Sequence, residues 1–248
     1  MNTQATENDV VYGLNPAFEA LLAGRRKIMR ASLGRQALRN PRVKKLESLC
    51  RQRDIPIETH EKGRLIHLAG SRDHQGVVLE TSPYPYGTFE DAVADVDRLL
   101  LLDNIEDPQN VGAILRSAEI LGFKTVLLPQ KGVPGVYPSV VKASAGATEH
   151  LTIIRDMNAP QYAKRLLAEG WQLVPLDAGG TVAPEEFQNE PGAKAALVIG
   201  GENKGVHQFI LNNARVVLRI PQQGRINSLN ASVAAGIAMY ELAKALGS

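Results

Sequence analysis

The sequence predicts an α/β fold with two domains, a smaller N-terminal domain and a larger one built on a parallel sheet. The chain has 248 residues, and protein domains are commonly about 100 to 150 residues long. Two prolines, a glycine and four acidic residues lie within residues 83–97 and indicate a linker. After it, apolar strand-like runs begin about every 20 to 26 residues, which leaves room for crossover helices. The predicted domains are residues 1–82 and 98–248.

Helices and strands alternate in the predicted N-terminal domain. Asn15 before Pro16 is a capping residue followed by proline at the first helical position, and this predicts a helix over residues 15–23. Asn40 and Pro41 predict a second helix, which ends near Arg53. Short strands are predicted over residues 27–33, 55–57 and 76–79.

Six strands are predicted in the second domain, over residues 99–102, 125–128, 151–154, 172–176, 195–199 and 216–220. Several of these runs are apolar without alternation, which is typical of a parallel sheet covered on both faces. Ligands of such sheets bind beyond the carboxyl ends of the strands. The loops that follow the strands are therefore the places to look for a functional site.

The loop over residues 103–112 leads into a predicted helix that Gly122 ends. The apolar side of this helix carries Ile114, Leu115, Ala118 and Leu121. Asn110 and Arg116 are six residues apart, about 240° around a regular helix. They converge on one ligand only if Asn110 lies at or before the helix start, which Asp107-Pro108 permits. Alternatively, Asn110 is a capping residue and Arg116 forms an ion pair with Glu119.

Two further loops have unusual compositions. Residues 200–205 are rich in glycine, and we expect the backbone at Gly200 to approach a ligand where a Cβ would intrude; a simple tight turn is the alternative. Residues 220–230 precede a helix rich in small residues, with Ser228 as its expected N-cap. The small residues permit close packing, either within the chain or at a dimer interface.

Charge is unevenly distributed along the chain. The net charge is +2, yet residues 25–53 hold 11 basic residues and one acidic residue, Glu47. Such a positive field favours a polyanionic partner, with an ordinary solvated surface as the alternative.

The composition argues against several other classes of protein. No apolar run approaches the roughly 18 residues of a membrane helix. Cys50 is the single cysteine and the five histidines lack ligand spacing, so neither metal nor thiol catalysis is expected. The first ten residues resemble neither a secretory signal nor a transit peptide, and we expect a cytoplasmic protein.

Three motifs in the chain resemble those of a known enzyme family. Residues 107–118 read Asp-Pro-Gln-Asn-Val-Gly-Ala-Ile-Leu-Arg-Ser-Ala, residues 198–202 read Val-Ile-Gly-Gly-Glu, and Ile-Pro at 220–221 precedes Ser-Leu-Asn-Ala-Ser-Val-Ala at 228–234. In this order they resemble the motifs of the SpoU (TrmH) group of SPOUT RNA ribose 2′-O-methyltransferases, and residues 142–151 resemble the segment between the first two. Residues 222–227 depart from the commoner Met- and Gly-containing version.

The N-terminal part also carries a resemblance. Residues 12–16, Tyr-Gly-Leu-Asn-Pro, and residues 74–77, His-Gln-Gly-Val, look like the L30e-like substrate-binding domain of the large-subunit rRNA guanosine enzymes in this group. Together the two resemblances imply a SPOUT domain with a deep trefoil knot, a bound S-adenosylmethionine and a homodimer.

The resemblance also assigns roles to residues. The expected reaction centre consists of Asn110, Arg116, Glu202, Ser228 and Asn230. The expected cofactor contacts are Ile199, Gly200, Gly201, Ile220, Leu229 and Ala231. The basic residues expected to bind RNA are Arg25, Arg26, Arg30 and Lys142.

The function implied is transfer of a methyl group to a guanosine ribose 2′-hydroxyl in a structured loop of large-subunit rRNA. A tRNA ribose methyltransferase is the alternative within this class. A non-catalytic RNA-binding assembly factor is the alternative from another class. Structured RNA and a second copy of the chain are the expected partners, without a membrane or a metal.

Overall fold

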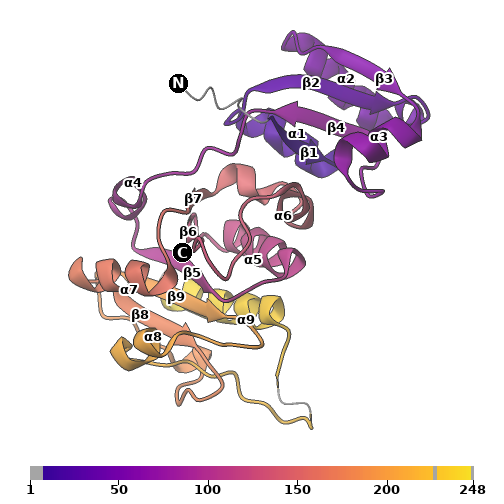
Figure 1. Ribbon diagram of the computed structural model, residues 1–248. Helices are drawn as coiled ribbons and strands as arrows, with labels where there is room; N and C mark the ends of the chain where they lie inside the picture. Colours follow the sequence, from indigo (N-terminus) through magenta and orange to yellow (C-terminus); the bar gives the residue numbers. More distant parts are fainter. Residues whose placement is uncertain (1–7, 226–227, 247–248) are drawn as a thin grey trace. The chain divides into compact units, whose positions relative to one another are not determined.

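The computed structural model describes residues 8–225 and 228–246, and contacts within it divide the chain into two compact units. The N-terminal unit comprises Met1–Pro85 together with Val136–His150, and the C-terminal unit comprises Tyr86–Gly135 and Leu151–Ser248. Figure 1 shows the elements of both. Sequence alone places residues 136–150 in the second domain, whereas their contacts group them with the first 85 residues.

The N-terminal unit is built on a four-stranded mixed sheet. Its strand order is β1 (Asp9–Tyr12), β4 (Val77–Thr81), β2 (Ile28–Gly34) and β3 (Ile57–His60). Only β2 and β3 are parallel, so their carboxyl ends meet, with Gly34 opposite His60.

The predicted helices of this unit are confirmed as α1 (Leu14–Ala23) and α2 (Pro41–Gln52). The prediction that Asn15 caps the first of them is wrong, because Gly13 is the N-cap and Asn15 already lies in the helix. The Asn40 side chain caps α2 by accepting a hydrogen bond from the Arg42 amide. The strand predicted from residue 55 begins at Ile57 as β3, because Pro56 meets the sheet only through its carbonyl, which accepts from the Ala31 amide. Strand β1 and helix α3 (Lys62–Ala69) were not predicted, and α3 has no side-chain cap to mark its start.

The segment 136–150 contains α6 (Pro138–Ala143) and the 3-10 helix η2 (Ala147–His150). Its main anchor is a buried ion pair in which the Arg26 guanidinium donates to both carboxylate oxygens of Glu149, at 3.1 and 2.8 Å. Asp9 accepts a further hydrogen bond from Arg26 at 2.9 Å. The Tyr84 hydroxyl donates to the Thr148 carbonyl at 2.8 Å.

The assignment of Arg26 to RNA binding is therefore corrected. Only 3% of this residue is exposed, and its guanidinium is fully buried between two carboxylates. A cation held in this way neutralises the interior of the unit, because buried charges require partners.

The C-terminal unit contains a five-stranded parallel sheet, which confirms the fold class. The strand order is β7 (Thr152–Ile154), β6 (Thr125–Leu127), β5 (Arg98–Asp103), β9 (Ala195–Gly200) and β8 (Gln172–Leu176). All four pairs are parallel. The predicted sixth strand, residues 216–220, is wrong: Leu218 makes only single bridges, to Leu176 and Val182. This segment lies between a strand end and a loop, which offer no strand-length partner.

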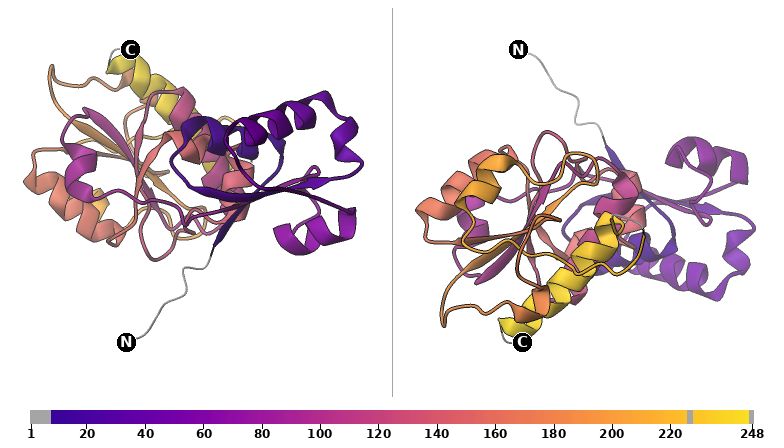
Figure 2. Two further views of the ribbon diagram at one scale, coloured as in Figure 1. Left: turned by 90° about the horizontal axis from the view of Figure 1, so that it is seen from above. Right: turned by 90° about the horizontal axis from the view of Figure 1, so that it is seen from below.

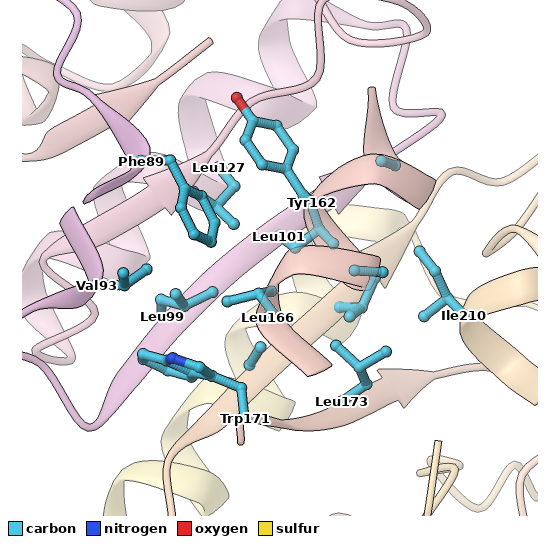
Figure 3. Close-up of a cluster of buried hydrophobic side chains, with 14 of the residues drawn as sticks. Phe89, Val93, Leu99, Leu101, Leu127, Tyr162, Leu166, Trp171, Leu173 and Ile210 are labelled. Atoms are coloured by element: carbon cyan, nitrogen blue, oxygen red, sulfur yellow. The ribbon is translucent and has the colours of Figure 1, made fainter. Parts of the chain in front are cut away.

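Helices cover the sheet. Residues of α4 (Phe89–Val93), α7 (Ala159–Ala168) and α8 (Gln208–Asn213) enclose Leu99 and Leu101 of β5 in a core that includes Trp171 (Figure 3). Two longer helices, α5 (Pro108–Ile120) and α9 (Ala231–Ala245), pack against each other; Figure 2 shows α9 in yellow. No helix within residues 8–225 and 228–246 is long and apolar enough to cross a membrane. The trefoil knot stays a prediction.

Candidate functional site

The carboxyl ends of β5 and β9 are adjacent, with Asp103 opposite Gly200, and the loops after both strands are packed together. A Cβ on Gly201 would lie 1.9 Å from the Asn104 carbonyl oxygen, and a Cβ on Gly200 would lie 2.5 and 2.6 Å from backbone atoms of Gly205 and Val206. The expectation that a Gly200 side chain would enter the ligand site is therefore wrong. Both glycines are required because backbone approaches backbone here.

A buried carboxylate fixes the second of these loops. The Asp103 side chain accepts a hydrogen bond of 2.7 Å from the His207 amide, and its two oxygens lie 2.7 and 2.8 Å from the His207 Nδ1. Burial raises the pKa of Asp103, while these hydrogen bonds from His207 act in the opposite direction. The pair ties residues 201–207 to the end of β5, and sequence reasoning did not single it out.

A pocket opens beside this loop. Its walls include all six residues predicted to hold the cofactor: Ile199, Gly200, Gly201, Ile220, Leu229 and Ala231. Glu202 and Ser228 of the predicted reaction centre also line it. Asp177 and Arg219 were not predicted, although Asp177 directly follows strand β8 and lies where ligands of parallel sheets bind. Residues 226 and 227 of the third loop lie outside the described residues.

Three side chains of the predicted reaction centre form one hydrogen-bonded group. The Asn230 side-chain amide donates to the Asn110 Oδ1 at 2.9 Å and to the Glu202 Oε1 at 3.3 Å. The same Glu202 oxygen accepts from the Ala231 amide at 3.2 Å. Residues 110, 202 and 230 come from the first turn of α5, the loop after β9 and the N-cap of α9, which are far apart in the sequence. The fold thus brings together what the motifs only suggested.

Asn230 also explains why helix α9 begins where it does. Its Oδ1 accepts from the Ser232 and Val233 amides at 3.0 and 3.4 Å, so Asn230 is the N-cap. The prediction that Ser228 caps this helix is wrong. The first turn of α9 and the three-residue group therefore share one side chain.

Arg116 is not brought to this group. Asp107 caps α5, which begins at Pro108, so Asn110 already lies in the first helical turn. Six residues later, Arg116 is about 240° away around the helix. Its exposed guanidinium has no hydrogen bond or ion pair with any part of the chain that the structure describes. The alternative ion pair with Glu119 is absent too, because Glu119 is paired with Lys124 at 2.7 Å.

The other three residues predicted to bind RNA have intramolecular contacts. Arg30 forms ion pairs with Glu58 and, at 3.4 Å, with Glu80. Lys142 donates to the Gln75 Oε1 at 2.9 Å, and partial burial lowers the pKa of its ammonium group. Arg25 is half-buried, with its guanidinium 5.8 Å from the centre of the Tyr84 ring.

Comparison with known families gives two matches that cover most of the chain. Residues 97–240 match the model of the SpoU rRNA Methylase family. Residues 10–87 match the family model described as RNA 2′-O ribose methyltransferase substrate binding. The two matches correspond to the pocket-bearing part and to the mixed-sheet part of the chain.

Individual relatives match along nearly the full length. A Bacillus subtilis (strain 168) protein, YacO, assigned to the TrmH family of tRNA/rRNA methyltransferases, is 31% identical over 243 residues and is covered to 95%, as is this chain. An uncharacterized tRNA/rRNA methyltransferase of Mycolicibacterium gilvum is 33% identical over 245 residues, which cover 96% of this chain and 77% of the relative.

Solved structures show the same fold. One described as an RNA 2′-O ribose methyltransferase has a TM-score of 0.82 at 25% identity, with 97% of this chain and 90% of that one covered. The methyltransferase AviRb of Streptomyces viridochromogenes, crystallised in complex with AdoMet, has a TM-score of 0.80 at 22% identity, with 98% and 93% covered.

Proposed function

We propose that this chain, which belongs to the SpoU rRNA methylase family, transfers a methyl group from S-adenosylmethionine to the 2′-hydroxyl of a guanosine ribose in large-subunit rRNA. RNA methylation at tRNA or rRNA is the activity common to the family and to the named relatives. The guanosine and the large-subunit rRNA are the finer part of the proposal. The observation that carries the proposed methyl transfer is the hydrogen-bonded Asn110–Glu202–Asn230 group, whose Glu202 lines the pocket.

The pocket suits a cofactor that combines the flat base of a nucleoside with a charged amino-acid end. Its walls include the aliphatic side chains of Leu176, Ile199, Ile220 and Leu229. Glycines 200, 201 and 205 also line it, and Asp177 and Arg219 supply one charge of each sign. When bound, S-adenosylmethionine supplies an electrophilic methyl group on a sulfonium.

The hydrogen-bonded group gives the chain a way to orient the ribose. Glu202 is held by two donors, the Asn230 side chain and the Ala231 amide. Asn230 is fixed as a helix cap and in turn fixes the Asn110 side chain by donating to its Oδ1. Each polar group therefore has a defined direction before RNA arrives, and preorganised polar groups stabilise developing charge without a reorganisation cost.

Arg116 has a different role in the proposal. A guanidinium stays protonated at neutral pH and is therefore a poor proton acceptor. We assign it to holding a phosphate next to the reacting ribose and to stabilising the alkoxide as it develops, with the proton lost to water or to another group. Because Arg116 and Asn110 lie on different sides of α5, this role requires the bound RNA or a second copy of the chain to bring the ribose and Arg116 together. Its exposed side chain, without a partner among the described residues, is available for this.

The substrate assignment is supported by the N-terminal unit. Residues 10–87 match a substrate-binding family model, and RNA is read by proteins mainly at unpaired bases and at the 2′-hydroxyl. A tRNA remains the alternative substrate, since the relatives are named for both RNAs.

A homodimer through the C-terminal unit is part of the proposal. Helix α9 exposes Val233, Ile237 and Tyr240, which are spaced at helical intervals along one side, and α5 exposes Ile120. An apolar stripe of this kind is what a second copy would cover. Sedimentation at micromolar concentration should give a mass of two chains. A mass of one chain would exclude the dimer.

The test of the activity is methyl transfer from labelled S-adenosylmethionine to bacterial rRNA and, separately, to tRNA, followed by mapping of the modified nucleotide. Label on one guanosine ribose of the large-subunit rRNA is the expected result, and label confined to tRNA would favour the alternative. Calorimetric titration with the cofactor separates an enzyme from a non-catalytic assembly factor, because the latter would not bind it at millimolar concentration.

A further inference from the structure

A second cavity lies in the N-terminal unit, at the end of its sheet where the parallel strands β2 and β3 finish. Its volume is about 280 Å³, near the lower end of the roughly 300 to 1,000 Å³ of ligand pockets. Three loops form the walls, those after β2, after β3 and before β4. Carboxyl ends of parallel strands are favoured positions for ligands.

One wall of this cavity contains a buried hydrogen-bond donor without an acceptor. His74 is only 4% exposed, and its Nδ1 accepts a hydrogen bond of 2.9 Å from the Gly76 amide. Burial, followed by the nearby charge of Lys62, lowers the pKa of the ring. With Nδ1 acting as acceptor, the ring is neutral with its proton on Nε2, and this N–H has no partner within residues 8–225 and 228–246.

An orphaned donor of this kind calls for an explanation, because an unsatisfied buried polar group is unfavourable. Its cost is offset if a bound molecule brings an acceptor. Nucleobase carbonyl and ring-nitrogen atoms are acceptors of the required kind.

The rim of the same cavity is positively charged. Arg35, Lys62 and Arg72 line it together with a single carboxylate, Glu61. Glu61 is paired with Arg35 at 3.0 Å, whereas Lys62 and Arg72 are exposed and have no ion pair with a described residue. The two cations without ion pairs suit a phosphate, and the neighbouring His74 donor suits the base attached to it.

We propose that this cavity binds an unpaired nucleotide of the RNA substrate, with the His74 Nε2–H donating to the base and with Lys62 and Arg72 contacting the flanking phosphates. The proposal rests on the proposed function for the identity of the ligand as RNA. It assigns RNA recognition to residues other than Arg26, Arg30 and Lys142, whose side chains are engaged within the chain.

The decisive variant is His74→Asn. The asparagine Oδ1 can replace the ring Nδ1 as acceptor for the Gly76 amide, while the Nε2 donor is lost. Equilibrium binding of the full chain to deproteinised bacterial 23S rRNA should weaken by about 2- to 12-fold, the range expected for one hydrogen bond. Because no charge is removed, the dependence of log K on log salt should keep the wild-type slope.

A second variant combines Lys62→Ala with Arg72→Ala. It removes charges at exposed positions, so we expect the stability of the fold to be unchanged. Each lost phosphate contact should lower the magnitude of the salt slope by roughly 0.7 to 0.9, so the pair should lower it by about twice that amount. The matched control is Lys44→Ala with Lys45→Ala on α2, which removes the same charge from exposed residues outside the cavity. The control should leave the slope at its wild-type value.

Unchanged affinity of the His74→Asn chain, or equal slope changes in the cavity pair and the α2 pair, would overturn the proposal. Failure of the two proposals can be told apart. If wild type methylates rRNA while the cavity variants bind it normally, the nucleotide pocket is wrong and the proposed function stands. If wild type transfers no methyl group but the cavity variants lose RNA binding as described, only the proposed function fails.

Discussion

The two units differ in where the structure places the side chains predicted to be functional. In the N-terminal unit, the four cations expected at the RNA are in contact with other parts of the chain, and Arg26 is buried. In the C-terminal unit, all six residues expected at the cofactor line one pocket. A cluster of basic residues thus indicates the class of partner without indicating which side chains contact it. Glycine-rich loops after parallel strands, in contrast, indicate where the ligand site lies.

The chain supplies a separate reporter for each unit. Cys50, the single cysteine, is buried on α2 in the N-terminal unit, and burial raises the pKa of its thiol to about 11. Trp171, the single tryptophan, is buried in the core of the C-terminal unit (Figure 3). Thiol labelling and tryptophan fluorescence therefore follow the stability of each unit independently in every variant considered below.

The largest effect is expected from Glu149→Ala. The change leaves the buried Arg26 guanidinium with Asp9 as its remaining carboxylate. Removing one partner of a buried ion pair costs about 3 to 5 kcal/mol. Labelling of Cys50 should accelerate strongly, while the fluorescence transition of Trp171 stays near that of wild type.

The control for this change is Glu19→Ala. Glu19 is paired with His150 at 2.8 Å, but both side chains are 36% exposed, and surface pairs contribute less than about 1 kcal/mol. Equal labelling rates in the two variants would mean that segment 136–150 is not anchored through Arg26, and the comparison of the units would lose its main structural support.

The next effect concerns catalysis at Arg116. Arg116→Ala should lower the methyl-transfer rate by about 10² to 10³, because a charge that stabilises the transition state is removed. Arg116→Lys keeps the charge without the planar fork and should retain measurable activity. Titration calorimetry should give wild-type cofactor affinity for both. A lysine variant that is inactive at neutral pH but rises log-linearly towards the lysine pKa would identify this residue as the base.

A smaller effect is expected from Gly201→Ala. The new Cβ would lie 1.9 Å from the Asn104 carbonyl oxygen, so the backbone must move. Overpacking of this kind costs typically about 1 to 3 kcal/mol, and Trp171 fluorescence should show it as a lower denaturation midpoint. Gly236→Ala on α9 is the control, because its Cβ would enter open space and alanine favours a helix by about 0.5 to 1 kcal/mol over glycine. A midpoint for Gly201→Ala at or above wild type would disprove the backbone contact.

Local patterns predicted much of the fold. Five of the six apolar runs after residue 98 form the parallel sheet, because such runs are buried on both faces whatever lies elsewhere in the chain. The pocket followed from the same reasoning, since the loops after the strands meet at one edge. Residues 216–220 were predicted as a strand in the same way. Their backbone instead bonds to Pro175, Asp177 and Val182, and no pattern within the segment predicts these partners.

The errors arose where the partner is distant in sequence. Arg26 and Glu149 are separated by 123 positions, and no spacing rule connects a basic cluster to one acidic residue so far away. His207 raised no signal, and His74 was noted only within the His-Gln-Gly-Val resemblance, because a single histidine becomes informative only through its neighbours in space. Arg116 shows the opposite case: the helix start at Pro108 decides its direction, and helix starts are predictable only to within a few residues.

The smallest effect distinguishes two residues of the third loop, Asn230 and Ser228. Asn230 accepts hydrogen bonds from the Ser232 and Val233 amides and therefore caps α9. Asn230→Ala should lower the stability of the C-terminal unit by about 1 kcal/mol, within a range of 0.5 to 2 for lost caps. Ser228→Ala should change it by less than about 0.5 kcal/mol. Trp171 fluorescence during urea unfolding measures both. If Ser228→Ala proved the more destabilising of the two, the helix would begin two residues earlier, and Asn230 would not be held in the direction that its contacts with Asn110 and Glu202 require.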